Sequence, residues 1–214
     1  MRIAALLLLA VALAGCGGGE GGTTEQAAAP PPKGGCSDAT SSVHDRTLSN
    51  EHKKLEAGKT YRLVFETNCG NFTVTLDQKL APNATGSLVS LAERGFFDDT
   101  FFHRIVPGFV IQGGDPTGMG SGGPGYSTHD SVPQNASYAH GVVAMAKSGA
   151  EPAGTAGSQF FVVTGQTVSL TPDYAIVGKV TDGLDVVDRI GKLGDAAEQP
   201  TRDVVISKVT VETS

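Results

Sequence analysis

The feature that most constrains the fold is a β-rich stretch in which polar residues interrupt apolar ones. Two short runs, Phe101–Val106 and Phe109–Gln112, flank a Pro-Gly pair, which is typical of a tight turn and predicts a β-hairpin. His103, Arg104 and Gln112 occupy positions in this hairpin that would otherwise be apolar. A lone arginine at a core edge usually extends to solvent, because its five donors are costly to bury unbonded. Three polar residues on one hairpin, followed by glycines, favour a binding groove.

Short strands dominate the sequence after residue 60. Alternating or continuous apolar runs predict further strands over Tyr61–Thr67, Phe72–Leu76, Val142–Ala146, Phe160–Thr164, Ala175–Val180 and Val204–Val211. Helical spacing predicts two helices, Pro82–Arg94 and Leu184–Ile190. About 155 residues are enough for one domain with a sizeable core. The pattern indicates an all-β sheet or barrel whose openings are covered by helices.

The first 15 residues have the form of an export signal. Arg2 precedes a 12-residue apolar run, Ile3–Ala14, which is too short to span a bilayer. The run leads into Ala14-Gly15-Cys16, which resembles the lipobox of bacterial lipoproteins, in which the cysteine is lipidated and becomes the mature N-terminus. An ordinary secretory signal cleaved nearby is the alternative, and either signal would export the protein. We therefore expect residues 1–15 to be a signal peptide and Cys16 to anchor the chain to the outer face of the cell membrane.

The residues that follow divide into a tether, an extension and a domain. Residues 16–35 are rich in glycine, contain three consecutive prolines and lack apolar periodicity, so we expect a flexible tether. Residues 36–60 form a polar N-terminal extension ahead of the domain, residues 61–214. Removing residues 1–15 takes away only Arg2 and leaves 15 basic against 22 acidic residues, a net charge of −7. An acidic chain without a basic cluster argues against nucleic acid or anionic lipid headgroups as partners, and a monomer is expected.

Two cysteines remain once Cys16 is assigned to the lipid. In an exported domain, Cys36 and Cys69 are best interpreted as a disulfide that ties the extension to the first predicted strands. Two free thiols or a metal pair are the alternatives. His44 and His52 lie nearby in the sequence but show no ligand spacing, so no metal site is expected.

Two further motifs do not indicate a function. Gly118–Gly123 fits the G-x-G-x-x-G pattern of dinucleotide sites, but Pro124 and Gly125 follow where a helix would have to begin. A turned or flexible glycine-rich loop is the better interpretation. The sequence also lacks the G-x-S-x-G elbow of serine hydrolases. No cofactor is therefore expected.

Four segments together resemble the cyclophilin-type peptidyl-prolyl isomerases: Phe102–Asp115, Gly141–Ala146, Gly157–Val162 and Ile176–Val180. They occur in the family's order within about Tyr61–Val211. The resemblance implies a closed eight-stranded antiparallel β-barrel capped by two α-helices, with an active groove on its outer face. It also implies a peptidyl-prolyl cis-trans isomerase that acts on proline-containing polypeptides.

By position, the family's catalytic arginine falls on Arg104, with His103 and Gln112 beside it on the same hairpin. The resemblance places the proline pocket and the rest of the groove on Phe109, Val110, Ala146, Lys147, Gln159, Phe161, Leu170 and Tyr174.

The sequence departs from the family at four of these or neighbouring positions. Lys147 replaces an asparagine that acts mainly through its main chain, and Val110 replaces a frequent methionine. Tyr174 stands where many members have histidine, and Ser169 where many have tryptophan. Loss of the tryptophan implies weak binding of cyclosporin but need not impair catalysis.

The residue chemistry agrees with the implied reaction. Rotation about an X-Pro bond breaks amide resonance without making or cutting a covalent bond, so no nucleophile, metal or cofactor is needed. In the twisted transition state the proline nitrogen regains a lone pair. A guanidinium aimed at that nitrogen would bind the transition state better than either ground state, and Arg104 is the candidate. Gln112 would hold Arg104 and the substrate backbone in place, whereas His103 is either a catalytic or a wall residue.

A non-catalytic proline-peptide binding or scaffold module at the cell surface is the alternative function. It would bind peptide without accelerating isomerisation. The presence of Arg104 favours the enzyme, because an apolar residue would suit a simple binding surface better.

Overall fold

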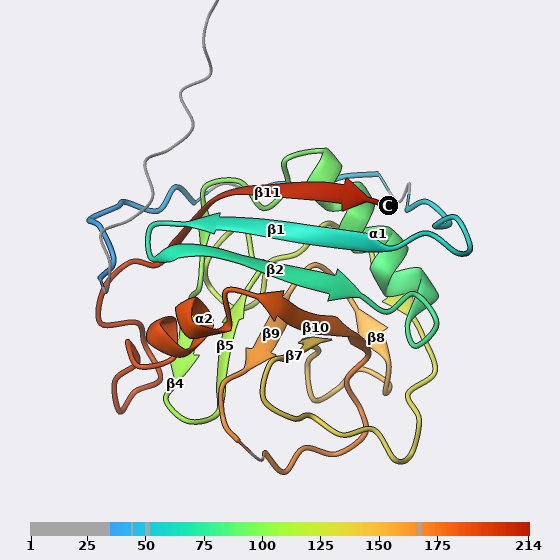
Figure 1. Ribbon diagram of the computed structural model, residues 1–214. Helices are drawn as coiled ribbons and strands as arrows, with labels where there is room; N and C mark the ends of the chain where they lie inside the picture. The colour runs from blue at the N-terminus through green and yellow to red at the C-terminus, as the bar shows by residue number, and fades with distance from the viewer. Residues whose placement is uncertain (1–34, 44, 50–51, 167) are drawn as a thin grey trace, which may run out of the picture.

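The computed structural model describes residues 35–43, 45–49, 52–166 and 168–214 (Figure 1). The expected signal peptide, Cys16 and all of the expected tether except Gly35 lie outside the described residues, as does His44. Among the described residues, no helix has the length and apolar character needed to cross a membrane.

A strongly curled antiparallel sheet forms most of the described structure. Its nine strands follow the order β3-β11-β1-β2-β10-β7-β9-β5-β4, and β6 and β8 form a separate pair. The main-sheet strands are β1 (Tyr61–Thr67), β2 (Gly70–Leu76), β3 (Thr100–Phe101), β4 (Arg104–Val106), β5 (Val110–Gly113), β7 (Val142–Met145), β9 (Phe160–Val163), β10 (Ile176–Asp182) and β11 (Val205–Thr213). The short pair is β6 (Thr128–His129) and β8 (Thr155–Ala156), which the sequence does not predict.

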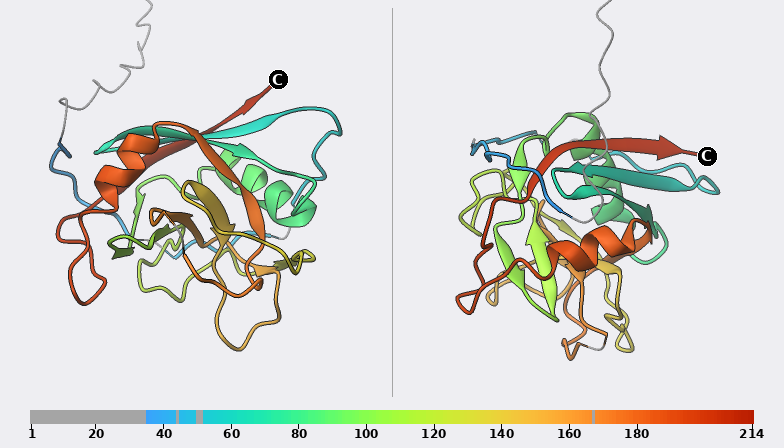
Figure 2. Two further views of the ribbon diagram at one scale, coloured as in Figure 1. Left: turned by 60° about the horizontal axis from the view of Figure 1, so that its bottom comes forward. Right: turned by 60° about the vertical axis from the view of Figure 1, so that its left-hand side comes forward.

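Aromatic side chains fill the interior of the curled sheet. The ring centroids of Phe65 on β1 and Phe160 on β9 lie 5.3 Å apart, although three strands separate β1 from β9 within the sheet. The Phe160 ring also packs edge-on against the rings of Phe97 and Phe102, with 6.1 Å between ring centroids in each pair. Phe65 stacks on Phe72 with 4.7 Å between the centroids. These contacts require the sheet to wrap around one core, as the views in Figure 2 show.

The expected closed eight-stranded barrel is wrong in its strand count, and its closure is not shown. The edge strands β3 and β4 are consecutive in the chain, with two residues between them. At this seam the Phe102 amide donates to the carbonyl of Val204, and the Ile105 amide donates to the carbonyl of Glu198, both at 3.0 Å. Loop carbonyls therefore occupy hydrogen-bonding positions that a strand ladder would use in a closed barrel.

The same seam divides the predicted strand Phe101–Val106 into β3 and β4. β3 pairs with β11 and β4 pairs with β5, so the chain changes partner at Phe102 and His103. The hairpin itself is as predicted, since Val106 pairs with Val110 around the Pro-Gly turn.

Two helices in the described chain agree with the predicted ones. α1 (Pro82–Glu93) packs against β11, and α2 (Leu184–Ile190) packs against β2. α1 begins with a proline, and its free amides are bonded by a distant side chain: the buried Asp130 carboxylate accepts from Asn83 and Ala84 at 3.0 and 2.8 Å. A carboxylate at this end also suits the helix dipole. The cap could not be predicted, because Asp130 lies 46 or more residues away in sequence.

The N-terminal extension lies along the domain. Arg46 donates to the carbonyls of Gly95 and Phe96 at 3.0 and 2.8 Å, and the Leu48 amide donates to the carbonyl of Pro124 at 2.9 Å. Gly86 in α1 explains how the extension passes so close. A side chain there would collide with the carbonyl oxygen of Lys53, so the helix carries a glycine despite its poor propensity.

A disulfide joins Cys36 at the start of the extension to Cys69 in the β1–β2 turn. The Ser37 amide also donates to the Asn68 carbonyl at 2.8 Å, beside the disulfide. The extension is thus attached to the sheet at its first residues.

Removing the disulfide should destabilise the protein. Replacing both Cys36 and Cys69 by serine frees a loop of about 34 residues and should lower the free energy of unfolding by about 3–4 kcal/mol on the chain-entropy model. Urea denaturation followed by fluorescence or circular dichroism measures the change. As a control, dithiothreitol should destabilise the wild type and leave the double variant unaffected. Equal unfolding free energies for the two proteins would contradict the prediction.

Candidate active site

Cross-strand register places the candidate catalytic residues in one row. Arg104 on β4 lies directly opposite Gln112 on β5, and Gln112 lies opposite Phe161 on β9. Phe161 in turn lies opposite Ala144 on β7. Directly opposite residues in an antiparallel sheet project from the same face, so these side chains share the outer face of the curled sheet.

The neighbouring row faces the core instead. Ile105 pairs with Ile111, and Ile111 pairs with Val162. All three are fully buried and belong to the main core. The alternation of side chains along each strand therefore separates the groove from the core.

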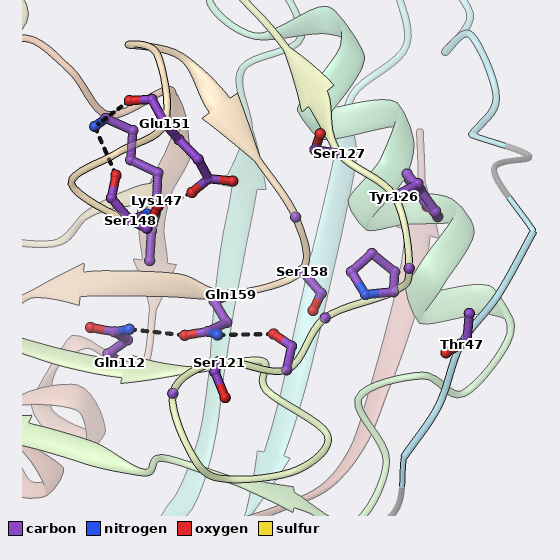
Figure 3. Close-up of a pocket in the computed structure, with 17 residues that line it drawn as sticks. Thr47, Gln112, Ser121, Tyr126, Ser127, Lys147, Ser148, Glu151, Ser158 and Gln159 are labelled. Carbon is purple, nitrogen blue, oxygen red and sulfur yellow. Dashed lines mark hydrogen bonds between the residues drawn. The ribbon is translucent and has the colours of Figure 1, made fainter.

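Arg104 is held from two sides. Its Nη1 donates to Oε1 of Gln112 at 3.3 Å, and its Nε donates to Oε2 of Glu198 at 2.7 Å. Gln112 donates from Nε2 to Gln159 at 3.0 Å, and Gln159 donates to the carbonyl of Gly122 at 2.9 Å, as Figure 3 shows. The chain of bonds connects Arg104 to the glycine-rich loop. The Arg104 side chain is 32% exposed.

Beside Arg104 lies an apolar cluster on the outer face of the sheet. Its buried members are Val110, Tyr138, Ala144, Phe161 and Val163. Partly buried residues pack against it, among them Phe109, Ala146, Leu170 and Tyr174. The four residues expected to form a proline pocket, Phe109, Val110, Phe161 and Leu170, are thus together, while the neighbouring Ser169 is exposed.

Tyr138 supports this cluster and was not predicted from the sequence. Its hydroxyl donates to the carbonyl of Tyr174 at 2.9 Å and accepts from the Tyr174 amide at 3.1 Å. The Tyr174 ring meets Phe161 edge-on at 5.5 Å. Burial raises the pKa of Tyr138 above its ordinary value, so the hydroxyl stays protonated as these bonds require. An aromatic residue in a polar loop was the available signal, but it did not indicate a partner.

A polar pocket of about 750 Å³ continues the groove (Figure 3). Gln112, Ala146 and Gln159 line it on the side of the apolar cluster, and the glycine-rich loop from Gly120 to Gly125 lines another wall. Ala146 borders both the apolar cluster and this pocket. The two together form a groove that could accept an extended peptide, with an apolar part and a polar part.

Lys147 lies at the rim of the polar pocket. Its Nζ donates to the carbonyls of Ser148 and Glu151 at 3.2 and 3.0 Å and lies 5.7 Å from the centroid of the Tyr174 ring. These bonds fold Lys147 onto its own loop, so its ammonium group is held at the wall.

His103 lies beneath the glycine-rich loop, outside the row that contains Arg104. It is 7% exposed, and neither ring nitrogen has a hydrogen-bond partner among the described residues. Burial lowers the pKa of His103, the charge of Arg104 lowers it further, and Asp115 partly opposes the shift. The imidazole is therefore neutral near pH 7. This arrangement favours the interpretation of His103 as a wall residue.

Asp115 anchors the same loop. Burial opposes its ionisation, but bonds from the amide of Gly122 and from the hydroxyl and amide of Thr117 hold the pKa of Asp115 below its ordinary value. The ionised carboxylate thus stabilises the turn that forms one wall of the polar pocket.

The chain belongs to the cyclophilin-type peptidyl-prolyl isomerases. Residues 62–211 match the family described as cyclophilin type peptidyl-prolyl cis-trans isomerase/CLD. The expected family and the expected class of enzyme are therefore confirmed.

Several curated proteins are similar over the domain. The peptidyl-prolyl cis-trans isomerase of Helicobacter pylori is 40% identical over 157 residues, which cover 72% of this chain and 94% of that protein. The Arabidopsis thaliana isomerase CYP18-2 is 35% identical over 159 residues, which cover 72% of this chain and 95% of that protein. The match to isomerase-like 2 of Cryptococcus neoformans is 37% identical over 167 residues, covering 74% of this chain but only 28% of that longer protein.

Solved structures give the same result. A crystal structure of a cyclophilin-type isomerase from Cryptosporidium parvum has a TM-score of 0.66 and 30% sequence identity, covering 72% of this chain and 98% of that chain. A second structure of the Cryptosporidium protein, in the presence of the dipeptide Ala-Pro, has a TM-score of 0.65 and 30% sequence identity. The match covers 71% of this chain and 98% of that chain.

The buried state of His103 predicts how stability changes with pH. The unfolded chain protonates this histidine with a pKa of about 6.5, whereas the folded protein holds the pKa lower. As the pH falls below about 6.5, the unfolded state gains protons first and the free energy of unfolding drops, by at most about 1.4 kcal/mol per pH unit from this group.

Urea denaturation at a series of pH values tests this expectation. His103→Leu should show a shallower loss of stability than the wild type between about pH 6.5 and pH 5, because it removes the titrating group. The exposed Met119 offers a control, since Met119→Leu replaces one group that does not titrate by another and should keep the wild-type slope. If the free energy of unfolding depends on pH with the same slope in His103→Leu and the wild type, burial does not lower the pKa of His103.

Proposed function

We propose that the protein accelerates rotation about X-Pro bonds in exported polypeptides, with Arg104 stabilising the twisted amide nitrogen. The observation that carries this proposal is the row formed by Arg104, Gln112 and Phe161. It places a bonded but partly exposed guanidinium next to an apolar cluster of suitable character for a pyrrolidine ring. A cation aimed at the proline nitrogen interacts more strongly with the twisted amide than with either planar isomer.

The apolar cluster would hold the proline, and the polar pocket would accept neighbouring residues of the peptide. Phe161, Phe109 and Leu170 offer apolar surface to the ring, while Gln112 offers an amide group to the peptide backbone. The structure of the Cryptosporidium relative in the presence of Ala-Pro supports a proline-containing ligand for this fold.

The required acceleration is consistent with a site in which Arg104 stabilises the transition state and the apolar cluster holds the proline ring. Uncatalysed rotation takes tens to hundreds of seconds, so turnover in milliseconds needs roughly a 10⁵-fold acceleration, or about 7 kcal/mol. One well-aimed donor contributes about 10²–10³-fold. The remainder would come from holding the ring while the flanking carbonyl turns.

Replacing Arg104 tests its role. Arg104→Ala should lower kcat/KM for a proline peptide by about 10²–10³-fold, because the transition state loses its cationic donor. The assay is a proline-peptide isomerisation measurement on the purified protein. Arg62→Ala is the matched control: Arg62 lies on β1 and its Nη1 donates to Ser214 Oγ, so activity should be unchanged. Equal activity of Arg104→Ala and the wild type would refute the assigned role.

We further propose that the protein acts outside the cytoplasm, attached to the cell membrane through lipidated Cys16. The support is the apolar run of Ile3–Ala14 followed by Ala14-Gly15-Cys16. Several acyl chains on one cysteine would give stable attachment, whereas one chain gives only marginal binding. The tether would hold the groove away from the bilayer, where it could meet exported polypeptides.

Lipidation can be measured directly. In a bacterial host, the full-length wild type should incorporate labelled palmitate and fractionate with membranes, whereas Cys16→Ala should do neither. Cys36→Ser should remain labelled and serves as the control for an unrelated cysteine. An unlabelled, soluble wild type would indicate an ordinary secretory signal instead.

A further inference from the structure

The loop after α2 holds a glutamate in an unusual backbone conformation. Glu198 has φ of 63°, in the left-handed region that glycine adopts freely and other residues seldom adopt. The turn around it is closed by Asp195, whose Oδ1 accepts from the amides of Ala197 and Gln199, both at 2.9 Å. The Glu198 amide donates to the Asp195 carbonyl at 3.1 Å. The surrounding turn therefore keeps Glu198 in this conformation.

This turn is docked on β4 beside Arg104. The Glu198 carbonyl accepts from the Ile105 amide at 3.0 Å, so its backbone is fixed to the residue that follows Arg104. Gly194 permits the close approach, because a side chain there would collide with the Ile105 carbonyl oxygen. The backbone of Glu198 is thus fixed against β4, the strand that carries the guanidinium of Arg104.

From that point the carboxylate reaches Arg104. Oε2 of Glu198 accepts from Nε at 2.7 Å, while Gln112 accepts from Nη1 at 3.3 Å. A guanidinium is planar with five N–H donors, so two partners on different nitrogens fix the orientation of the plane. The remaining Nη donors stay available to a ligand in the groove.

Stability alone does not account for this arrangement. The two partners are 32% and 48% exposed, and ion pairs this accessible contribute little to folding. A glutamate in the left-handed region is also less favourable there than glycine. A disfavoured backbone conformation beside a functional group points to a functional constraint.

We propose that Glu198 is a positioning residue, which holds the guanidinium of Arg104 so that its Nη donors face the groove. The inference rests on the proposed role of Arg104 and extends it. Glu198 acts through Arg104 and itself touches no substrate. Its effect should appear in the rate of the chemical step more than in peptide affinity.

Two substitutions separate positioning from folding. Glu198→Gly removes the carboxylate and suits the positive φ, so the melting temperature should be maintained or raised while kcat falls about tenfold and KM changes little. Glu198→Gln keeps an acceptor oxygen without the charge and should lie between Glu198→Gly and the wild type. Asp185→Asn is the matched control: Asp185 pairs with Arg189 on the exposed side of α2, so kcat should not change.

A double-mutant cycle with Arg104→Ala tests whether Glu198 acts on catalysis through Arg104. If Glu198 acts through Arg104, adding Glu198→Gly to Arg104→Ala should cause no further loss of kcat/KM. The inference is overturned if Glu198→Gly alone has wild-type activity, or if it lowers activity by the same factor in both backgrounds. It is likewise overturned if the losses of kcat and melting temperature run in parallel. Full activity of Arg104→Ala is a different result, which refutes the proposed function of Arg104 itself.

Discussion

The antiparallel register of β4, β5 and β9 is the constraint on which the rest of the structure depends. Side chains alternate between the two faces of a strand, so one register assigns Ile105, Ile111 and Val162 to the core and Arg104, Gln112 and Phe161 to the groove. A slip by one residue would exchange the two sets and bury the arginine. Core packing therefore protects the arrangement of the site, because a one-residue slip that misplaces the groove also exposes the isoleucines.

A reaction in which no covalent bond changes depends on geometry more than on reactive groups. The groove fits that requirement: its residues lie on paired strands, and hydrogen bonds run from Glu198 through Arg104, Gln112 and Gln159 to the glycine-rich loop. Strands hold their side chains more rigidly than loops do. The flexible-looking glycine-rich segment is likewise fixed, by Asp115.

Local sequence pattern was enough to predict both helices, the longer strands and the hairpin that carries Arg104 and Gln112. The family resemblance then indicated the pocket residues, which the fold brings together. What could not be predicted depends on distant partners: the break at Phe102 and His103 follows from a change of pairing strand, and the two-residue strands β6 and β8 have no periodicity to detect. Glu198 lies 94 residues from Arg104 in a polar loop that nothing local distinguishes. Tyr138 is recognisable only once its hydroxyl is seen on the backbone of Tyr174.

The disulfide at the start of the extension also has a mechanical consequence. The extension crosses α1 and reaches the glycine-rich loop, where Thr47 lines the polar pocket. A pull on the chain ahead of Cys36 is transmitted through a covalent bond to the turn that joins β1 and β2, two strands paired along their whole length. A pull at Cys36 would therefore be borne by the sheet and would not peel the extension from the pocket wall.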